Sequence, residues 1–166
     1  MAGGAPIRVL QLLSDNQPGG GMVQMQQFAR WVDREAFHFE FAMPSGGPMP
    51  ESLKAMGQTV HAVELSSRFG LNDVSHLMRL CNERGIDVLH SHNVRANVHA
   101  RVAGWRARVP ARVSTIHNSV YHYDVSALNQ HLYAMAERLT LRWCDRVIAV
   151  SEGVANELRS RYGLAT

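Results

Sequence analysis

The sequence has little cysteine, a single lysine and no long apolar run, and these shortages exclude several classes of protein. Cys81 and Cys144 are the only cysteines, they lie far apart, and neither belongs to a Cys-x-x-Cys pair. That spacing argues against a disulfide framework and against a zinc site. No segment approaches the roughly 20 consecutive apolar residues of a membrane-spanning helix, and the N-terminus lacks the basic start and apolar run of a signal peptide. We therefore expect a cytoplasmic protein, with peripheral attachment to the inner face of a membrane left open.

Charge and length set looser bounds. The formal net charge is +3. Lys54 is the only lysine, so the other basic residues, histidine aside, are all arginines. Arginine binds phosphate and carboxylate through two parallel hydrogen bonds, although a bias in base composition would produce the same excess. A chain of 166 residues with an apolar fraction of 46% is long enough to bury the core of one domain. We expect residues 1–166 to form a single domain.

Short apolar runs alternate with longer amphipathic segments along the whole chain. This alternation is typical of β-α-β units built on a parallel sheet. The predicted strands are Ile7–Leu13, Phe37–Ala42, Thr59–Glu64, Ile86–Ser91, Ala111–Ile116 and Arg146–Val150. The predicted helices are Met22–Val32, Glu51–Met56, Asn72 or Asp73 to Arg84, Arg95–Trp105, Ser126–Trp143 and Glu152–Tyr162, with Gly85 and Gly163 ending two of them. The predicted fold is α/β, with a parallel sheet of about six strands flanked by helices.

Polar residues stand at the carboxyl ends of four predicted strands. They are Ser14–Asn16, His90–Asn93, His117–Ser119 and Ser151–Glu152. In open parallel sheets, ligands bind outside the carboxyl ends of the strands, where helix N-termini also point their free N–H groups. Four separate segments therefore indicate one ligand site at one edge of the sheet.

Three consecutive glycines, Gly19, Gly20 and Gly21, precede the first predicted helix. Glycines at the start of a helix allow the backbone to come close to an anion or a sugar. The loop lacks the GxGxxG spacing of a dinucleotide site, no acidic residue ends the second strand, and no Gly-Lys-Ser/Thr of a Walker loop follows. We interpret the glycines as a backbone contact for a substrate, with a flexible turn as the alternative.

Three histidines are candidates for a metal site or for catalysis. His90 and His92 alternate along one strand and so share a face, and His117 ends the next strand. Three imidazoles can hold a metal ion, but no carboxylate motif accompanies them, and we predict neither a metal nor a cofactor. We favour His117 as a hydrogen-bonding or proton-handling group at a substrate hydroxyl. The alternative is a satisfied core histidine.

The segment Ala149–Gly153 resembles the nucleophile elbow of hydrolases, with Ser151 as the nucleophile. That mechanism needs an acid and then a histidine downstream of the serine, whereas His131 is the last histidine of the chain. We therefore reject the hydrolase interpretation. Ser151 is more simply the N-cap of the last helix, with Glu152 well placed against the helix dipole.

Four segments together resemble the N-terminal domain of retaining GT-B glycosyltransferases, the large group that includes bacterial lipopolysaccharide, capsule and mannosyl transferases. They are Leu12–Met22, Asp87–His92, Val113–Asn118 and Cys144–Glu152, in the order and spacing of that family. The resemblance implies a Rossmann-like domain, one half of a GT-B fold. In such enzymes the N-terminal domain mainly holds the acceptor and the C-terminal domain binds the nucleotide-sugar. Transfer takes place between them with retention of configuration, usually without a metal.

The resemblance also implies roles for residues of this chain. The glycine loop Gly19–Gly21 would approach the donor diphosphate or the transferred sugar, and His117 would lie near the reacting sugar. Asn118 and Tyr121, with the two residues that follow, would line the acceptor side. The other expected substrate contacts are Asn16, His92, Ser151 and Glu152. Met22 stands where an acidic residue often follows the glycines, which is a departure from the family.

Members of that family normally continue beyond a residue like Gly163 into a further strand and then into the nucleotide-sugar domain, which we expect to be absent from this chain. The isolated chain would then be the acceptor-binding half of an enzyme and inactive alone. Its partners would be a nucleotide-sugar, a glycan or lipid-linked acceptor and the missing C-terminal domain. The alternative is a free-standing, non-catalytic α/β module that binds a small ligand or a protein at the same edge.

A group of arginines surrounds one predicted helix and the turn after it. They are Arg95, Arg101, Arg106, Arg108 and Arg112, with Trp105 among them. Family members that glycosylate lipids often dock on anionic membranes through this domain, and the group is a candidate for that contact. A solvated helix face is the alternative. No aromatic residues alternate with the arginines in a recognised motif, so we predict no nucleic-acid partner.

Overall fold

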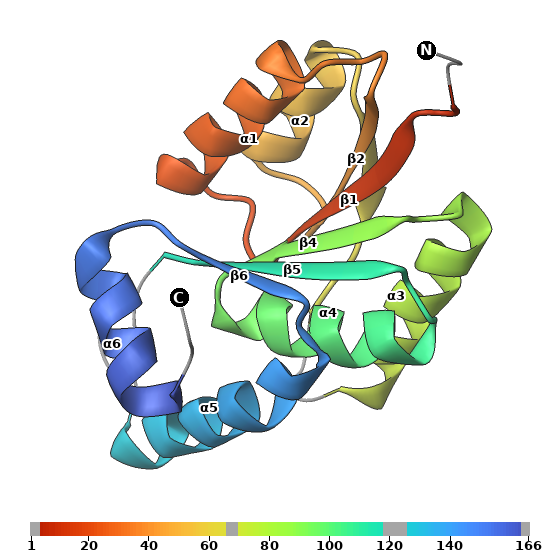
Figure 1. The fold of residues 1–166 in the computed structure, drawn as a ribbon. Coiled ribbons are helices and arrows are strands. Elements are labelled where there is room, and N and C mark those ends of the chain that lie inside the picture. Colours follow the sequence, from red (N-terminus) through yellow and green to blue (C-terminus); the bar gives the residue numbers. More distant parts are fainter. Residues whose placement is uncertain (1–3, 66–69, 118–125, 164–166) are drawn as a thin grey trace.

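The computed structural model describes residues 4–65, 70–117 and 126–163. These residues form a single six-stranded sheet with helices on both faces (Figure 1). The strands are β1 (Ile7–Leu13), β2 (Phe37–Met43), β3 (Thr59–Ala62), β4 (Val88–His92), β5 (Ala111–Ile116) and β6 (Arg146–Ala149). The helices are α1 (Gly20–Trp31), α2 (Pro48–Ala55), α3 (Leu71–Arg84), α4 (Val94–Arg106), α5 (Ala127–Thr140) and α6 (Glu152–Tyr162), with the 3-10 turn η2 (Leu141–Trp143) after α5. Within the described ranges, no helix is long and apolar enough to cross a membrane.

The sheet is parallel throughout, with the strand order β3-β2-β1-β4-β5-β6. Helices α1 and α2 cover one face, α3 and α4 cover the other, and α5 packs against α4 on that second side (Figure 1). The winding therefore reverses between β1 and β4, because α1 leaves β1 on one face and α4 leaves β4 on the opposite face. Open α/β sheets bind ligands at such a switch point.

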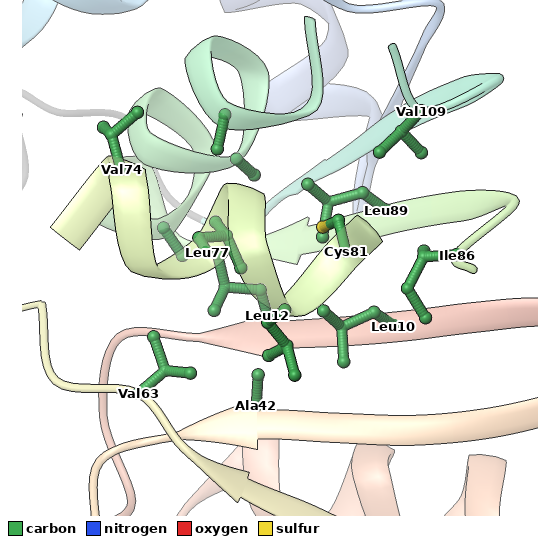
Figure 2. Packing of buried hydrophobic residues seen from close by; sticks show 14 of the residues in the cluster. Leu10, Leu12, Ala42, Val63, Val74, Leu77, Cys81, Ile86, Leu89 and Val109 are labelled. Carbon is green, nitrogen blue, oxygen red and sulfur yellow. The ribbon is translucent and has the colours of Figure 1, made fainter. Parts of the chain in front are cut away.

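Side chains of β1 point alternately to the two faces of the sheet and so belong to two separate hydrophobic cores. Leu10 and Leu12 belong to the larger cluster, which packs against α3 and α4, whereas Leu13 belongs to the smaller cluster under α1 and α2. In Figure 2, Leu77 and Cys81 of α3 lie over the leucines of β1. Burial raises the pKa of the Cys81 thiol to about 12, so this cysteine is an unreactive core residue.

Each predicted strand and helix is present, and the differences lie at their ends. Helix α1 begins at Gly20 rather than at Met22, so two of the three glycines lie inside the helix. Helix α2 begins at Pro48 rather than at Glu51, because the fixed φ of proline suits the first turn of a helix. These boundaries do not change the topology that the alternating pattern predicts.

The predicted N-cap of α3 was wrong, whereas its C-cap is confirmed. Neither Asn72 nor Asp73 caps the helix, which starts after Gly70 without a side-chain hydrogen bond. Gly85 ends it with a φ of 58°, in the left-handed region that glycine adopts most easily.

A buried carboxylate joins three strands and a helix on the face covered by α3. Glu40 of β2 is fully buried, and its oxygens accept hydrogen bonds from Arg8 at 3.2 Å and from Arg84 at 2.9 Å. His61 Nε2 of β3 lies 2.6 Å from the same carboxylate. Burial raises the pKa of Glu40, but the hydrogen bonds from Arg84 and His61 outweigh this effect and hold the pKa at about 2. The carboxylate is therefore ionised at neutral pH.

Arg101 does not belong to the exposed arginine group that the sequence suggests. It is fully buried, donates to Ser114 Oγ of β5 at 3.0 Å and lies 3.7 Å from the Glu137 carboxylate of α5. Arg112 is also engaged, because its guanidinium pairs with Asp145 at 2.8 Å. Both arginines therefore hold the fold together, and they leave the basic surface to other residues.

Candidate functional site

The carboxyl ends of β1, β4, β5 and β6 lie at one edge of the sheet, as the sequence predicts. Leu13 at the end of β1 pairs in register with His92 at the end of β4. Across the switch point between these strands, Asn93 Nδ2 donates a hydrogen bond to Asp15 Oδ2 at 3.1 Å. This edge is the candidate functional site.

The three histidines of the site form one cluster. His90 and His92 share the face of β4 that α1 covers, and the ring of Phe28 lies 6.3 and 6.4 Å from their ring centroids. The centroids of the two histidines are 4.4 Å apart, and that of His117 is 5.6 Å from His92. The alternation along the strand therefore predicted the shared face correctly.

Hydrogen bonds connect the cluster across three strands. His92 Nε2 lies 2.8 Å from Gln11 Oε1 on β1, and His92 Nδ1 lies 3.3 Å from His117 Nε2 at the end of β5. His90 Nε2 lies 2.8 Å from Thr115 Oγ1 on β5. A continuous chain thus runs from Gln11 through His92 to His117.

Burial keeps this cluster uncharged at neutral pH. It lowers the pKa of His90 to about 4, with a further contribution from His117. It lowers the pKa of His92 to about 2, again with contributions from the neighbouring histidines. Burial also lowers the pKa of the half-buried His117, although the negative charge of Asp15 acts in the opposite direction. The cluster is therefore a neutral array of hydrogen-bonding groups.

Gln11 and Thr115 complete the site but were not selected from the sequence, whereas Asp15 and Asn93 belong to the strand-end segments that the sequence indicates. Gln11 is a single polar residue within the buried part of β1, which is a signal that sequence reasoning can use. Asn93 has a φ of 71°, in the left-handed region that residues other than glycine seldom adopt, and it immediately precedes α4. Such backbone strain is common at functional sites.

The glycine loop stands where β1 leads into α1. Gly19 has an extended backbone, and Gly20 and Gly21 form the first two residues of the helix. A Cβ atom at Gly19 or Gly20 would meet nothing within 4 Å, and one at Gly21 would only touch Leu13 at 3.9 Å. Nothing in the described part of the chain therefore requires glycine at these three positions.

Asn16 joins the loop after β1 to the loop after β2. Its Nδ2 donates to the carbonyl oxygens of Gly46 at 2.7 Å and Ser45 at 3.0 Å, while its Oδ1 accepts from Gln17 Nε2 at 2.9 Å. The amide of Asn16 thus holds the edge loops together in this structure. Its expected contact with a substrate stays a prediction.

The remaining predicted site residues lie at or near this edge or outside the described residues. Ser151 caps α6 as predicted, because its Oγ accepts from Val154 N at 3.3 Å. Glu152 is exposed and pairs with Arg159 at 3.0 Å. Asn118 and Tyr121 lie outside the described residues.

The site does not have the donor arrangement of a metal centre. In the part of the chain that the structure describes, no three His, Cys, Asp or Glu side chains gather as metal ligands. Both ring nitrogens of His92 are already engaged, one with Gln11 and one with His117.

Sequence comparison identifies the family. Residues 18–166 match the family described as Glycosyltransferase Family 4. The chain belongs to glycosyltransferase family 4. The family 4 match includes the glycine loop, the histidine cluster and Ser151, and it begins just after Asp15 and Asn16. No curated protein matches the sequence.

Several solved structures share the fold of this family 4 chain. HepE of Anabaena, in complex with UDP, is 17% identical, with a TM-score of 0.73 over 93% of this chain and 41% of HepE. The lipopolysaccharide outer core galactosyltransferase WaaB is 12% identical, with a TM-score of 0.70 over 96% of this chain and 43% of WaaB. A UDP-N-acetylglucosamine 2-epimerase is 10% identical, with a TM-score of 0.65 over 96% of this chain and 46% of the epimerase.

These identities are low, so the similarity shows the fold alone. The fold is the Rossmann-like α/β fold found in GT-B glycosyltransferases, as the sequence predicts. The chain spans less than half the length of each of the three proteins.

Proposed function

We propose that this family 4 chain is the acceptor-side half of a retaining GT-B glycosyltransferase. The whole enzyme moves a sugar from a nucleotide-sugar to a glycan or lipid-linked acceptor. The observation that carries the proposal is the neutral, hydrogen-bonded histidine cluster at the switch point of the sheet. HepE, which has a similar fold, was solved with UDP and with UDP-glucose, and this supports a nucleotide-sugar as the donor.

His117 acts beside the reacting sugar. It stands just beyond the carboxyl end of β5, half-buried, next to the Asp15–Asn93 pair. An uncharged imidazole can form a hydrogen bond with a sugar hydroxyl. A cationic imidazole would instead be attracted to the diphosphate of the donor. Asn118 and Tyr121 follow His117 along the chain, and we assign them to the acceptor.

The glycine loop lies at the N-terminus of α1 and faces the donor. A helix N-terminus carries unpaired N–H groups and a partial positive charge, both of which favour a phosphate group. Side chains at Gly19 and Gly20 would project into space that the described residues leave empty, and a Cβ atom at Gly21 would meet only Leu13, at 3.9 Å. A donor that lies close to the backbone would explain why glycine occurs at these positions, which the packing of the described residues does not explain.

The division between two halves has a direct test. Because the donor is held mainly by the other half, the isolated chain should give no saturable heat when UDP- and GDP-sugars are titrated calorimetrically at micromolar concentrations. The matched control is the proposed two-domain enzyme, which should bind one of these donors. A clear micromolar saturation with the isolated chain would contradict the proposed division.

We also propose a contact with an anionic membrane, through a surface on α5 and the turn after α4. Along α5, Leu128, Met135 and Leu139 are 70%, 56% and 54% exposed, with Leu132 between them on the same face. The only carboxylate of this helix, Glu137, is buried on the opposite side.

Aromatic and basic side chains continue this surface beyond α5. The rings of Trp105 and Trp143 stack at 4.9 Å, and Arg142 lies 4.4 Å from the ring of Trp143. Arg106 and Arg108 are exposed beside Trp105. An apolar helix face flanked by arginine and tryptophan complements the headgroups and acyl chains of an anionic bilayer.

Vesicle flotation tests the membrane contact. The chain should float with vesicles that contain phosphatidylglycerol and remain unbound with pure phosphatidylcholine, and high salt should weaken the binding. Leu139→Glu should abolish flotation, whereas Leu71→Glu, at a leucine of α3 that is 75% exposed, should not. Absence of binding at low salt, or a dimer that buries Leu139 in solution, would contradict the proposal.

A further inference from the structure

His117 has two ring nitrogens, and the described residues form a hydrogen bond with only one of them. Nε2 lies 3.3 Å from His92 Nδ1. Among the described residues, Nδ1 of His117 has no hydrogen-bond partner. Nδ1 is therefore the nitrogen available to a ligand, and its protonation decides whether it accepts or donates a hydrogen bond.

The residue on the far side of His92 sets the direction of the hydrogen-bond chain. Gln11 Oε1 can only accept, and it lies 2.8 Å from His92 Nε2, so that nitrogen carries the proton. A neutral imidazole has one N–H group, so Nδ1 of His92 carries a lone pair and can only accept a hydrogen bond. It accepts a hydrogen bond from Nε2–H of His117, which leaves Nδ1 of His117 without a proton.

This arrangement of protons exists only while both rings are neutral, and the surroundings of the rings keep them neutral. Gln11 and His92 are buried, with exposed fractions of 1% each, and the apolar ring of Phe28 lies 6.3 and 6.4 Å from the rings of His90 and His92. Burial lowers the pKa of His92 to about 2 and lowers the pKa of His117. Asp15, whose charge opposes the shift at His117, is itself paired with Asn93.

We propose that Gln11 and His92 are positioning residues that fix His117 as the Nε2–H tautomer, with Nδ1 as the acceptor for a substrate hydroxyl. The identity of the ligand as a sugar rests on the proposed function, whereas the tautomer does not. A fixed acceptor selects ligands that donate a hydrogen bond to it. A sugar that lacks the hydroxyl leaves the lone pair unsatisfied and binds less well.

The tautomers are measured on the chain itself by long-range ¹H–¹⁵N NMR with ¹⁵N-labelled histidine. The pH is kept well above the ordinary histidine pKa of about 6.5, so that the rings are neutral. The expected spectrum has protonated Nε2 and unprotonated Nδ1 in both His92 and His117. A proton on Nδ1 of His117 overturns the proposal without any variant being made.

Two substitutions at Gln11 separate a directed chain from simple packing. Gln11→Glu keeps an oxygen acceptor and removes the N–H₂ donor, so it should leave the His117 tautomer as in the wild type. With His92 still neutral in the variant spectrum, a reversal of the tautomer in Gln11→Glu would mean that the native glutamine donates, which overturns the proposal. Gln11→Leu has no acceptor and should give a mixture of His117 tautomers; one unchanged tautomer would exclude a positioning role for Gln11.

Thr115→Val is the matched control within the same cluster. It removes the partner of His90 and leaves the three-residue chain intact. The His117 tautomer should stay fixed in this variant, and a loss equal to that in Gln11→Leu would show that the cluster responds only to packing. These measurements do not depend on the proposed function. A reversed tautomer in an active transferase would contradict the tautomer proposal alone. The expected tautomer in a protein without transfer activity would contradict the proposed function alone.

Discussion

Asn16 Nδ2 donates a 2.7 Å hydrogen bond to the carbonyl oxygen of Gly46. This contact joins the loop after β1, which leads to the three glycines, to the loop after β2. The neighbouring Gly47 completes the junction. It has a φ of 81°, and a Cβ atom there would lie 3.2 Å from Asn16 Nδ2. The loop that leads from β1 to the three glycines is therefore held both by the amide and by the absence of a side chain opposite it.

Gly47→Ala should destabilise the chain more than Gly46→Ala. Both glycines have a positive φ, which makes alanine unfavourable by about 1 kcal/mol. Only at Gly47 would the new methyl group also press against Asn16. Urea denaturation measures the free energy of unfolding, and the difference between the two variants should shrink in an Asn16→Ala background. Equal losses at the two glycines would rule out the close contact with Asn16.

Gly20→Ala should have opposite effects on stability and on activity. Alanine favours the helix by about 0.5 kcal/mol because it restricts the unfolded chain, and its Cβ meets nothing in the described residues. In the proposed two-domain enzyme the same methyl group would obstruct the donor, so transfer should fall about tenfold, which corresponds to roughly 1.4 kcal/mol. Thermal unfolding and a transfer assay give the two readouts. A destabilised chain with unchanged transfer would mean that the glycine serves the fold.

Glu40→Gln should destabilise the chain by about 3 kcal/mol, because Arg8, Arg84 and His61 would lose the buried carboxylate that they share. The pKa of Glu40 is about 2 in the folded chain, against an ordinary value of 4.5. A carboxyl with a lowered pKa contributes stability that is complete above its ordinary value and is lost as the pH falls towards 2. Urea denaturation across this range should give a shallower acid slope for Glu40→Gln than for the wild type. Parallel slopes would contradict the assignment.

The buried pair of Arg101 and Glu137 should behave as a unit. Burial raises the pKa of Glu137, and the charge of Arg101 opposes that rise. Arg101→Met leaves a buried carboxyl without its partner and should cost about 3 to 5 kcal/mol, with a larger loss as the pH increases and the carboxyl must ionise. The double variant Arg101→Met, Glu137→Leu should recover most of this loss. A double variant as unstable as the sum of the two single variants would exclude the pairing.

The sheet and its functional edge were predictable because they follow from local patterns. Strands buried on both faces appear as short apolar runs, and parallel strands place their carboxyl ends together. The period of two along β4 also places His90 and His92 on one face. The partner of His92 was not predictable in this way, because Gln11 is 81 residues distant along the chain and only the strand order brings them together.

Helix periodicity was less informative about which face is buried. The spacing of Leu128, Leu132, Met135 and Leu139 indicates a helix, but the structure turns this apolar face outward. The inward face instead carries Glu137, which meets the buried Arg101 of α4. A period of 3.6 residues identifies side chains that share a face, and the neighbouring helix decides whether that face is packed or exposed.

The proposed transferase activity, and the role of His117 in it, are measured by sugar transfer with the longest natural protein that contains this chain. The assay supplies labelled UDP- and GDP-sugars and follows the label into glycan and lipid fractions, with His117→Ala compared with His76→Ala at an exposed histidine of α3. We expect transfer to fall at least about 100-fold in His117→Ala, because a group that handles a reacting hydroxyl is lost, and to stay near the wild-type level in His76→Ala. Absence of transfer from any of these donors, or full activity of His117→Ala, would contradict the proposed function.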